Sequence, residues 1–99
     1  FAEAWNIGPS IDHEVPVSTI VESVKNLWGP GADWSRDTGD HPHESKFLRL
    51  DCSKAYARFG WRSRITLDDG LALAVQWYRA AKGGADMRAL SLKQLSQFV

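Results

Sequence analysis

The longest helical signal in the chain is TLDDGLALAVQWYRAAK, residues 66–82. Thr66 can accept a hydrogen bond from an early backbone N–H, and Asp68 and Asp69 stand at the positive end of the helix dipole. Gly83-Gly84 predicts the helix end. Apolar residues recur at helical spacing along a stripe of Leu67, Leu71, Ala74, Val75 and Tyr78, with Leu73 and Trp77 off it. The helix therefore has more than one apolar side.

Two flanking helices are predicted from capping boxes, in which a hydroxyl is followed three residues later by a carboxylate or amide. Residues 19–22, TIVE, open the first, in a stretch where apolar residues recur at helical spacing from Val17 to Trp28. Gly29-Pro30-Gly31 predicts its end. Residues 91–94, SLKQ, open a final helix.

A short helix is predicted over residues 52–58, with Asp51 as its N-cap and Gly60 in the left-handed conformation at its end. Short apolar or alternating runs, bounded by turn residues, predict three short strands. They cover residues 4–7, 32–36 and 46–50. The predicted order is strand, helix, strand, strand and three helices, which is an α+β arrangement.

Composition narrows the function classes. The 99 residues are 43% hydrophobic and 11% aromatic, with 12 basic and 12 acidic residues and a net charge of zero. A chain of this length is expected to form one domain. Zero net charge argues against general nucleic-acid binding. The lone Cys52 fits a reducing compartment, and no apolar run is long enough for a membrane span, so a cytoplasmic protein without membrane contact is expected.

Residues 39–44, GDHPHE, form the segment richest in chemical groups. Imidazoles and carboxylates can bind metal, but the third histidine, His13, is distant in sequence, and no metal site is predicted. A solvated surface loop is one interpretation. A ligand loop is another, because an imidazole can donate to a phosphate oxygen and a carboxylate can accept from sugar hydroxyls.

Other patterns are interpreted as structural. Tyr78 and Lys82 have a Tyr-x-x-x-Lys spacing, but they stand at the end of an amphipathic helix, where a tyrosine in the apolar stripe and a lysine near the C-terminus are typical. Cys52 is interpreted as a small buried residue. A local basic cluster is interpreted as a solvated helix face and turn; its members are Lys54, Arg58, Arg62 and Arg64.

Taken together, residues 39–78 resemble the C-terminal lobe of the extended short-chain dehydrogenases, the family of nucleotide-sugar epimerases and dehydratases. The similar segments are HPHE at 41–44, DCSKA at 51–55, FGWRS at 59–63 and TLDDGL at 66–71, followed by Trp77-Tyr78. AWNIG at 4–8 is similar to the strand that precedes this lobe. HPHE, AWNIG and the extended LDCSKA run resemble the branch of the family whose substrate is CDP-glucose.

The resemblance implies an α+β fold: a small, mostly helical substrate-binding lobe over residues 1–99, with two or three short strands and the Rossmann half absent. It places Glu44 against ribose hydroxyls and His41 near the nucleotide phosphates, where the broader family has arginine. The family's NAD-binding glycine loop and catalytic residues lie in its N-terminal half. We therefore expect no catalytic residue and no cofactor in this chain, and NAD in the parent enzyme.

The expected partners follow from the same resemblance. They are a CDP-sugar, the missing N-terminal Rossmann half, and other copies of this chain through exposed apolar surface. Since the chain begins with Phe1, we expect it to be a piece of a longer protein. Two alternatives stay open: the same lobe of another nucleotide-sugar epimerase or dehydratase, and a stand-alone, non-catalytic interaction domain.

Overall fold

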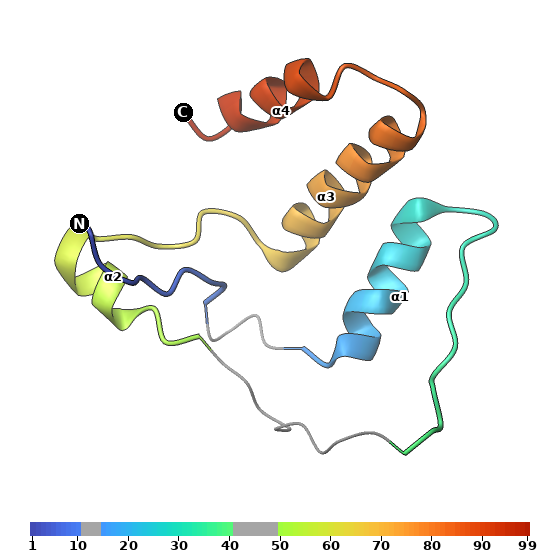
Figure 1. Cartoon of the computed structure of the whole chain (residues 1–99), viewed down its shortest axis with the longest axis horizontal. Helices are drawn as coiled ribbons and strands as arrows, with labels where there is room; N and C mark the ends of the chain where they lie inside the picture. Colours follow the sequence, from blue (N-terminus) through green and yellow to red (C-terminus); the bar gives the residue numbers. More distant parts are fainter. Residues whose placement is uncertain (11–14, 41–49) are drawn as a thin grey trace. The chain divides into compact units, whose positions relative to one another are not determined.

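The computed structural model describes residues 1–10, 15–40 and 50–99. In these residues it contains four helices: α1, Val17–Trp28; α2, Ser53–Phe59; α3, Leu67–Lys82; and α4, Met87–Ser96 (Figure 1). The chain divides into two compact units. Unit 1 comprises residues 1–14 and 35–63, with α2, and unit 2 comprises residues 15–34 and 64–99, with α1, α3 and α4.

In unit 2, helix α3 contacts both α1 and α4. Val75, on α3, is buried with 6% of its surface exposed. On the side toward α4, the Trp77 indole N–H donates to the Ser91 hydroxyl at 3.0 Å. The Gln94 amide donates to the Leu73 carbonyl at 3.0 Å and to the Gln76 side chain at 2.9 Å. The two apolar sides predicted for this helix are thus explained by its two neighbours.

The predicted ends of α3 are confirmed. The Thr66 hydroxyl accepts from the Asp69 backbone N–H at 3.1 Å, and the acidic residues of the first turn are Asp68 and Asp69. The helix ends before Gly83, and Gly84 follows at a φ of 77°. A positive φ is costly for residues with a side chain, which explains a glycine at this turn.

The predicted start of α1 is wrong. The helix begins at Val17 after Pro16, with no side-chain cap, rather than at the predicted capping box of residues 19–22. The carboxylate of Glu22 instead accepts from the Trp34 indole N–H at 2.7 Å. The capping residues are therefore inside the helix, and the predicted box partner bonds to a neighbouring segment.

The predicted start of α4 is also wrong: the cap lies at Asp86, five residues before Ser91. The helix begins at Met87, and the Asp86 carboxylate accepts from the Ala89 backbone N–H at 3.0 Å. Ser91, the predicted cap, lies within the helix and accepts from Trp77. Aspartate caps a helix about as well as serine does, so Asp86 can begin the helix before Ser91.

Helix α2 agrees with its prediction within one residue at each end. The predicted cap is wrong: the N-cap residue is Cys52, with no side-chain cap, and the Asp51 carboxylate, one residue earlier, accepts from the Ser53 backbone N–H at 2.9 Å. At the other end Gly60 has a φ of 70°, in the left-handed region, and its N–H donates to the Tyr56 carbonyl at 2.8 Å.

The α+β prediction is wrong: the described residues contain helices and no strand. Segments 4–7 and 32–36 belong to neither a helix nor a strand, whereas residues 46–49 of the third predicted strand lie outside the described residues. A strand requires neighbouring backbone groups as partners. Here the Ala4 carbonyl accepts from the Lys54 ammonium at 3.0 Å, and the Ala32 N–H donates locally to the Gly29 carbonyl at 3.3 Å.

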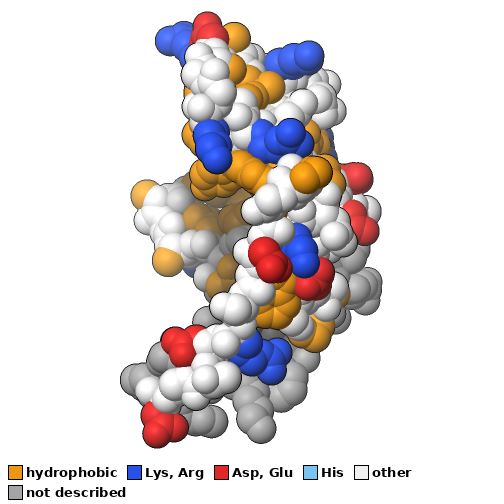
Figure 2. All heavy atoms as spheres, turned by 90° about the vertical axis from the view of Figure 1, so that its right-hand side faces the viewer, with side chains coloured by type: hydrophobic (Ala, Val, Ile, Leu, Met, Phe, Trp, Pro, Cys, Tyr) orange, Lys and Arg blue, Asp and Glu red, His pale blue; other side chains and the backbone are white. Residues whose placement is uncertain are grey.

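Little of the described chain is buried. Ala55, at 1% exposure, and Val75 are the buried hydrophobic residues in it. Several large apolar side chains are well exposed, among them Tyr78 at 63%, Leu95 at 61% and Leu92 at 57%. Figure 2 shows hydrophobic side chains reaching the surface between charged ones. In the described part, none of the helices combines the length and the apolar character that crossing a membrane requires.

Candidate functional site

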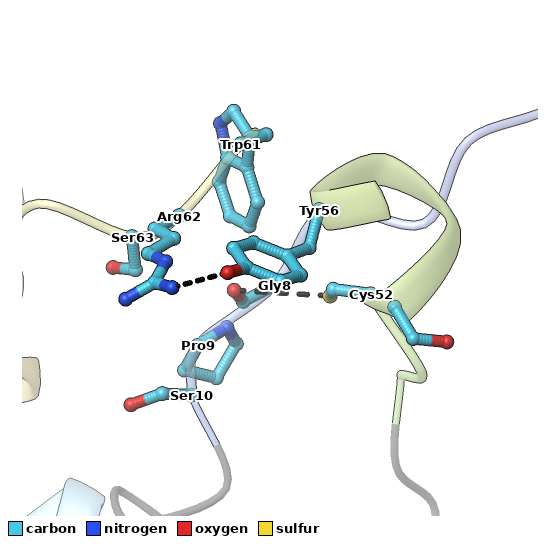
Figure 3. Close-up of a pocket in the computed structure, with 9 residues that line it drawn as sticks. Gly8, Pro9, Ser10, Cys52, Tyr56, Trp61, Arg62 and Ser63 are labelled. Atoms are coloured by element: carbon cyan, nitrogen blue, oxygen red, sulfur yellow. Dashed lines mark hydrogen bonds between the residues drawn. The ribbon is translucent and has the colours of Figure 1, made fainter. Parts of the chain in front are cut away.

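A pocket of about 340 Å³ lies in unit 1 (Figure 3). Three segments form it: the extended residues 8–10, the start of α2 and the turn that follows α2. The residues lining it are Gly8, Pro9, Ser10, Cys52, Ser53, Tyr56, Trp61, Arg62 and Ser63. It carries both a charged group and aromatic rings, which makes it the candidate site in the described residues.

A close backbone approach joins the first two segments. A Cβ added at Gly8 would lie 3.1 Å from the Leu50 Cδ1 atom and 3.7 Å from the Cys52 sulfur. The Cys52 thiol is 4.0 Å from the Gly8 carbonyl oxygen and 3.8 Å from that of Leu50, both within the range of weak S–H bonds. Cys52 is half-buried rather than buried as predicted, and its two weak contacts favour a packing role.

The turn after α2 brings the third segment back over the helix. The Trp61 N–H donates to the Ala55 carbonyl at 3.4 Å, directly after the left-handed Gly60. The next side chain, Arg62, then reaches Tyr56: its Nη2 atom donates to the phenol oxygen at 2.6 Å, and its Cζ atom lies 4.4 Å from the ring centroid. Bonding and stacking together hold the guanidinium at the pocket.

The start of α2 carries a fixed negative charge. The Ser53 side chain, and then its backbone N–H, hold the pKa of the Asp51 carboxyl below its usual range. Asp51 is fully exposed and stays ionised at neutral pH. Its role is to hold the first turn of α2, from which Cys52 and Tyr56 contribute to the pocket wall.

An aromatic cluster lies elsewhere in unit 1. The Trp5 and Phe59 rings meet edge to face at 5.0 Å between centroids, and Phe1 meets Phe59 at 5.8 Å. The Lys54 ammonium lies 4.5 Å from the Trp5 ring centroid and 3.5 Å from the Glu3 carboxylate. These contacts attach the start of the chain to α2.

Three of the four basic residues grouped by the sequence have separate partners. Lys54 contacts Trp5 and Glu3, Arg62 contacts Tyr56, and Arg64, in unit 2, donates to the Phe98 carbonyl at 3.1 Å. Their side chains are exposed, in agreement with a solvated helix face and turn. They do not form a single basic patch within either unit.

The Tyr78–Lys82 pair is likewise separated by its contacts. The Tyr78 ring meets Trp77 edge to face at 5.3 Å, and the Lys82 ammonium lies 5.9 Å from the Trp28 ring centroid. Tyr78 was expected in the apolar stripe, and its exposure shows that it extends beyond the packed side of α3. These positions favour the structural interpretation of the pair.

The two predicted substrate-binding residues, His41 and Glu44, lie outside the described residues. Their roles stay predictions. Sequence reasoning missed the pocket itself, because no spacing rule brings residues 8–10 to α2. The contact between Tyr56 and Arg62 could have been found from the sequence. The two residues stand six positions apart, with Gly60 between them to reverse the chain.

Comparison with known proteins gives the chain its relatives. Over all 99 residues it is 39% identical to the CDP-glucose 4,6-dehydratase of Salmonella typhimurium strain LT2. The chain is related to a C-terminal part of that dehydratase. A further 44% identity, over 39 residues, links it to the dTDP-glucose 4,6-dehydratase of Haemophilus influenzae strain Rd. No protein-family model matches the chain.

The resemblance predicted from the segments at 41–44 and 51–55 is thereby confirmed. The match to the Salmonella dehydratase spans 28% of that enzyme, and the match to the Haemophilus dehydratase spans 39% of this chain and 12% of that enzyme. The chain thus corresponds to a minor part of the length of either 4,6-dehydratase.

Proposed function

We propose that this chain forms the nucleotide-sugar-binding part of a 4,6-dehydratase acting on CDP-glucose, and that the reacting groups belong to another part of such an enzyme. The observation that supports this most is the 39% identity to CDP-glucose 4,6-dehydratase over the whole chain. The described residues supply a small pocket and exposed apolar side chains, both suited to a binding lobe.

In this proposal, the loop at residues 41–44 contacts the nucleotide. The Glu44 carboxylate accepts hydrogen bonds from the ribose hydroxyls, and the His41 imidazole donates to a phosphate oxygen. Protonated imidazole is the better partner for an anion, so His41 makes nucleotide binding stronger at lower pH. The support is the position of both residues in the segment that resembles the family's nucleotide loop.

NAD, which the family uses to take up and return a hydride, does not fit the residues described here. The Gly29-Pro30-Gly31 run follows α1 and caps its end at Gly29, and its two glycines have φ values of 99° and 90°. A dinucleotide loop instead leads from a strand into a helix N-terminus. We therefore assign NAD and the hydride transfer to the rest of a longer enzyme.

The exposed apolar side chains of unit 2 support a proposal about partners. We assign Tyr78, Leu92 and Leu95 to contact with the Rossmann part of the same enzyme. If the 99-residue chain is purified alone, this surface should lead to self-association, because monomers rarely leave large apolar patches open. Sedimentation at high concentration measures it. A monomer that binds no dye specific for apolar surface would contradict the proposal.

The test of the main proposal is calorimetric titration of CDP-glucose into the natural protein that contains these residues. Glu44→Ala should weaken binding about 10- to 100-fold, since a charge-assisted hydrogen bond contributes roughly 1.5–3 kcal/mol. Asp68→Ala, an exposed carboxylate of α3, is the matched control and should bind as the wild type does. The shared stretch with dTDP-glucose 4,6-dehydratase makes dTDP-glucose the competing ligand to titrate in parallel.

His41→Ala tests the phosphate contact separately. Wild-type affinity should rise as the pH falls from about 8 to 5, the range over which an unperturbed imidazole gains its proton. The variant should show a flatter dependence. Wild-type affinity in both the Glu44 and His41 variants would remove the loop from the site.

A further inference from the structure

We propose that the unit 1 pocket binds a small organic anion, a carboxylate or a phosphate ester on an apolar body, with Arg62 as the residue that holds the anionic group. This proposal is independent of the proposed function, because it requires neither His41 nor Glu44.

The guanidinium of Arg62 has donors left for a ligand. Within the described part of the chain, its guanidinium contacts the Tyr56 hydroxyl and ring and no carboxylate. A guanidinium has five N–H donors, of which the phenol oxygen uses one through Nη2. The others can bind an oxyanion in the paired geometry that arginine favours.

Two contacts with Tyr56 fix the position of the Arg62 guanidinium. Its guanidinium lies over the Tyr56 ring, 4.4 Å from the centroid, while the 2.6 Å bond fixes its direction. Figure 3 shows it beside Ser63, with the Tyr56 phenol end pointing toward it. A cation fixed in this way loses less side-chain freedom on binding than an unrestrained lysine or arginine would.

The size and lining of the pocket suit a small organic molecule. Its volume of about 340 Å³ falls in the range of small-molecule sites. Pro9, Trp61 and the Tyr56 ring give it apolar walls, as Figure 3 shows. A ligand that combines an oxyanion with a ring or short chain can satisfy both the guanidinium and these walls. An inorganic anion satisfies the guanidinium alone.

The experiment is calorimetry of the natural protein that contains these residues, with phenyl phosphate, benzoate and inorganic phosphate as probes. Phenyl phosphate or benzoate should bind at least about tenfold more tightly than inorganic phosphate, and the better of the two identifies the anionic group. Arg62→Gln should weaken that binding about tenfold. Arg62→Lys keeps the charge without the paired donors and should weaken it about threefold.

Arg58→Gln is the control: it removes an exposed charge that does not line the pocket and should leave the affinity unchanged. Tyr56→Phe tests how Arg62 is held, because it keeps the ring but removes the hydroxyl that fixes the guanidinium, and it should weaken binding about threefold. NMR shifts of the Gly8 amide and the Trp61 indole on titration place the probe in the pocket.

Several results would overturn the proposal. Equal binding by wild type and Arg62→Gln would do so, as would equal losses in Arg62→Gln and Arg58→Gln. Probe binding without shifts at Gly8 and Trp61 would place the ligand elsewhere. Glu44→Ala should bind phenyl phosphate as the wild type does, so failure of the nucleotide-sugar proposal remains distinguishable from failure of this one.

Discussion

Unit 2 and unit 1 are stabilised in different ways. In unit 2, two helices, α1 and α4, pack along α3, Val75 is buried, and side-chain caps fix the starts of α3 and α4. Unit 1 has one helix of seven residues, and Ala55 is its buried side chain among the described residues. Its non-helical segments are joined by the Lys54 contacts, the Cys52 thiol and edge-to-face aromatic rings.

Unit 2 is thus a set of packed helices, whereas unit 1 contains the candidate binding pocket. In unit 2, hydrogen bonds within each helix satisfy the backbone, and side chains pack the helices together. Unit 1 has few such bonds and instead presents side chains from distant parts of the sequence around a pocket. The following changes test whether this division holds.

The largest effect is expected from Ala55→Leu. Ala55 is 1% exposed, so three added carbons must displace their neighbours, at a cost of about 1–3 kcal/mol. Hydrogen exchange should become faster at the Gly60 and Trp61 amides, whose bonds depend on α2. Ala57→Leu, at an exposed position of the same helix, is the control. Unchanged exchange at Gly60 would show that Ala55 is not the packing centre of unit 1.

A smaller effect is expected from Asp86→Ala, which removes the cap of α4 and should cost about 1 kcal/mol. Ser91→Ala should also destabilise unit 2, by about 0.5–1.5 kcal/mol, because the Trp77 indole loses its partner. The two differ in location: Asp86→Ala should expose the Ala89 amide to exchange, and Ser91→Ala should not. Faster exchange of the Ala89 amide in Ser91→Ala but not in Asp86→Ala would contradict the assignment of Asp86 as the cap of α4.

The smallest effect is expected from Asp33→Asn, and it should depend on pH. The Trp34 backbone N–H, and then Lys25, hold the pKa of the fully exposed Asp33 carboxyl below its ordinary value of 3.8. A carboxyl whose pKa is lowered in the folded state adds stability above its unfolded pKa, and that stability is lost as the pH falls through the folded pKa. Thermal melts at pH 7 and pH 2.5 should therefore differ less in the variant. An equal difference in both proteins would show that the contact with Trp34 and Lys25 adds no stability.

The sequence predicted the helices better than their starts. Thr66 was predicted to cap the start of α3, and Gly60 was predicted to end α2 in the left-handed conformation. Both predictions were confirmed. Thr19 and Ser91 carry similar local signals, but the Glu22 carboxylate and the Ser91 hydroxyl bond to the indoles of Trp34 and Trp77. Such competition from tertiary contacts has no local signature.

The strands and the pocket were beyond local prediction for a related reason. An extended run such as residues 4–7 becomes a strand only with a paired neighbour, and in the described residues its partner is the Lys54 side chain. The pocket depends on Gly8 lying against Leu50 and Cys52, more than 40 residues away along the chain. A family resemblance could identify the segments, but it could not place them together.

The most direct test of the account is the affinity of the natural protein for CDP-glucose before and after Glu44→Ala, with Asp68→Ala beside it. The account predicts a loss of about 10- to 100-fold for the Glu44 variant and wild-type affinity for the Asp68 variant. Equal affinity in all three proteins would contradict the claim that this chain holds the nucleotide sugar.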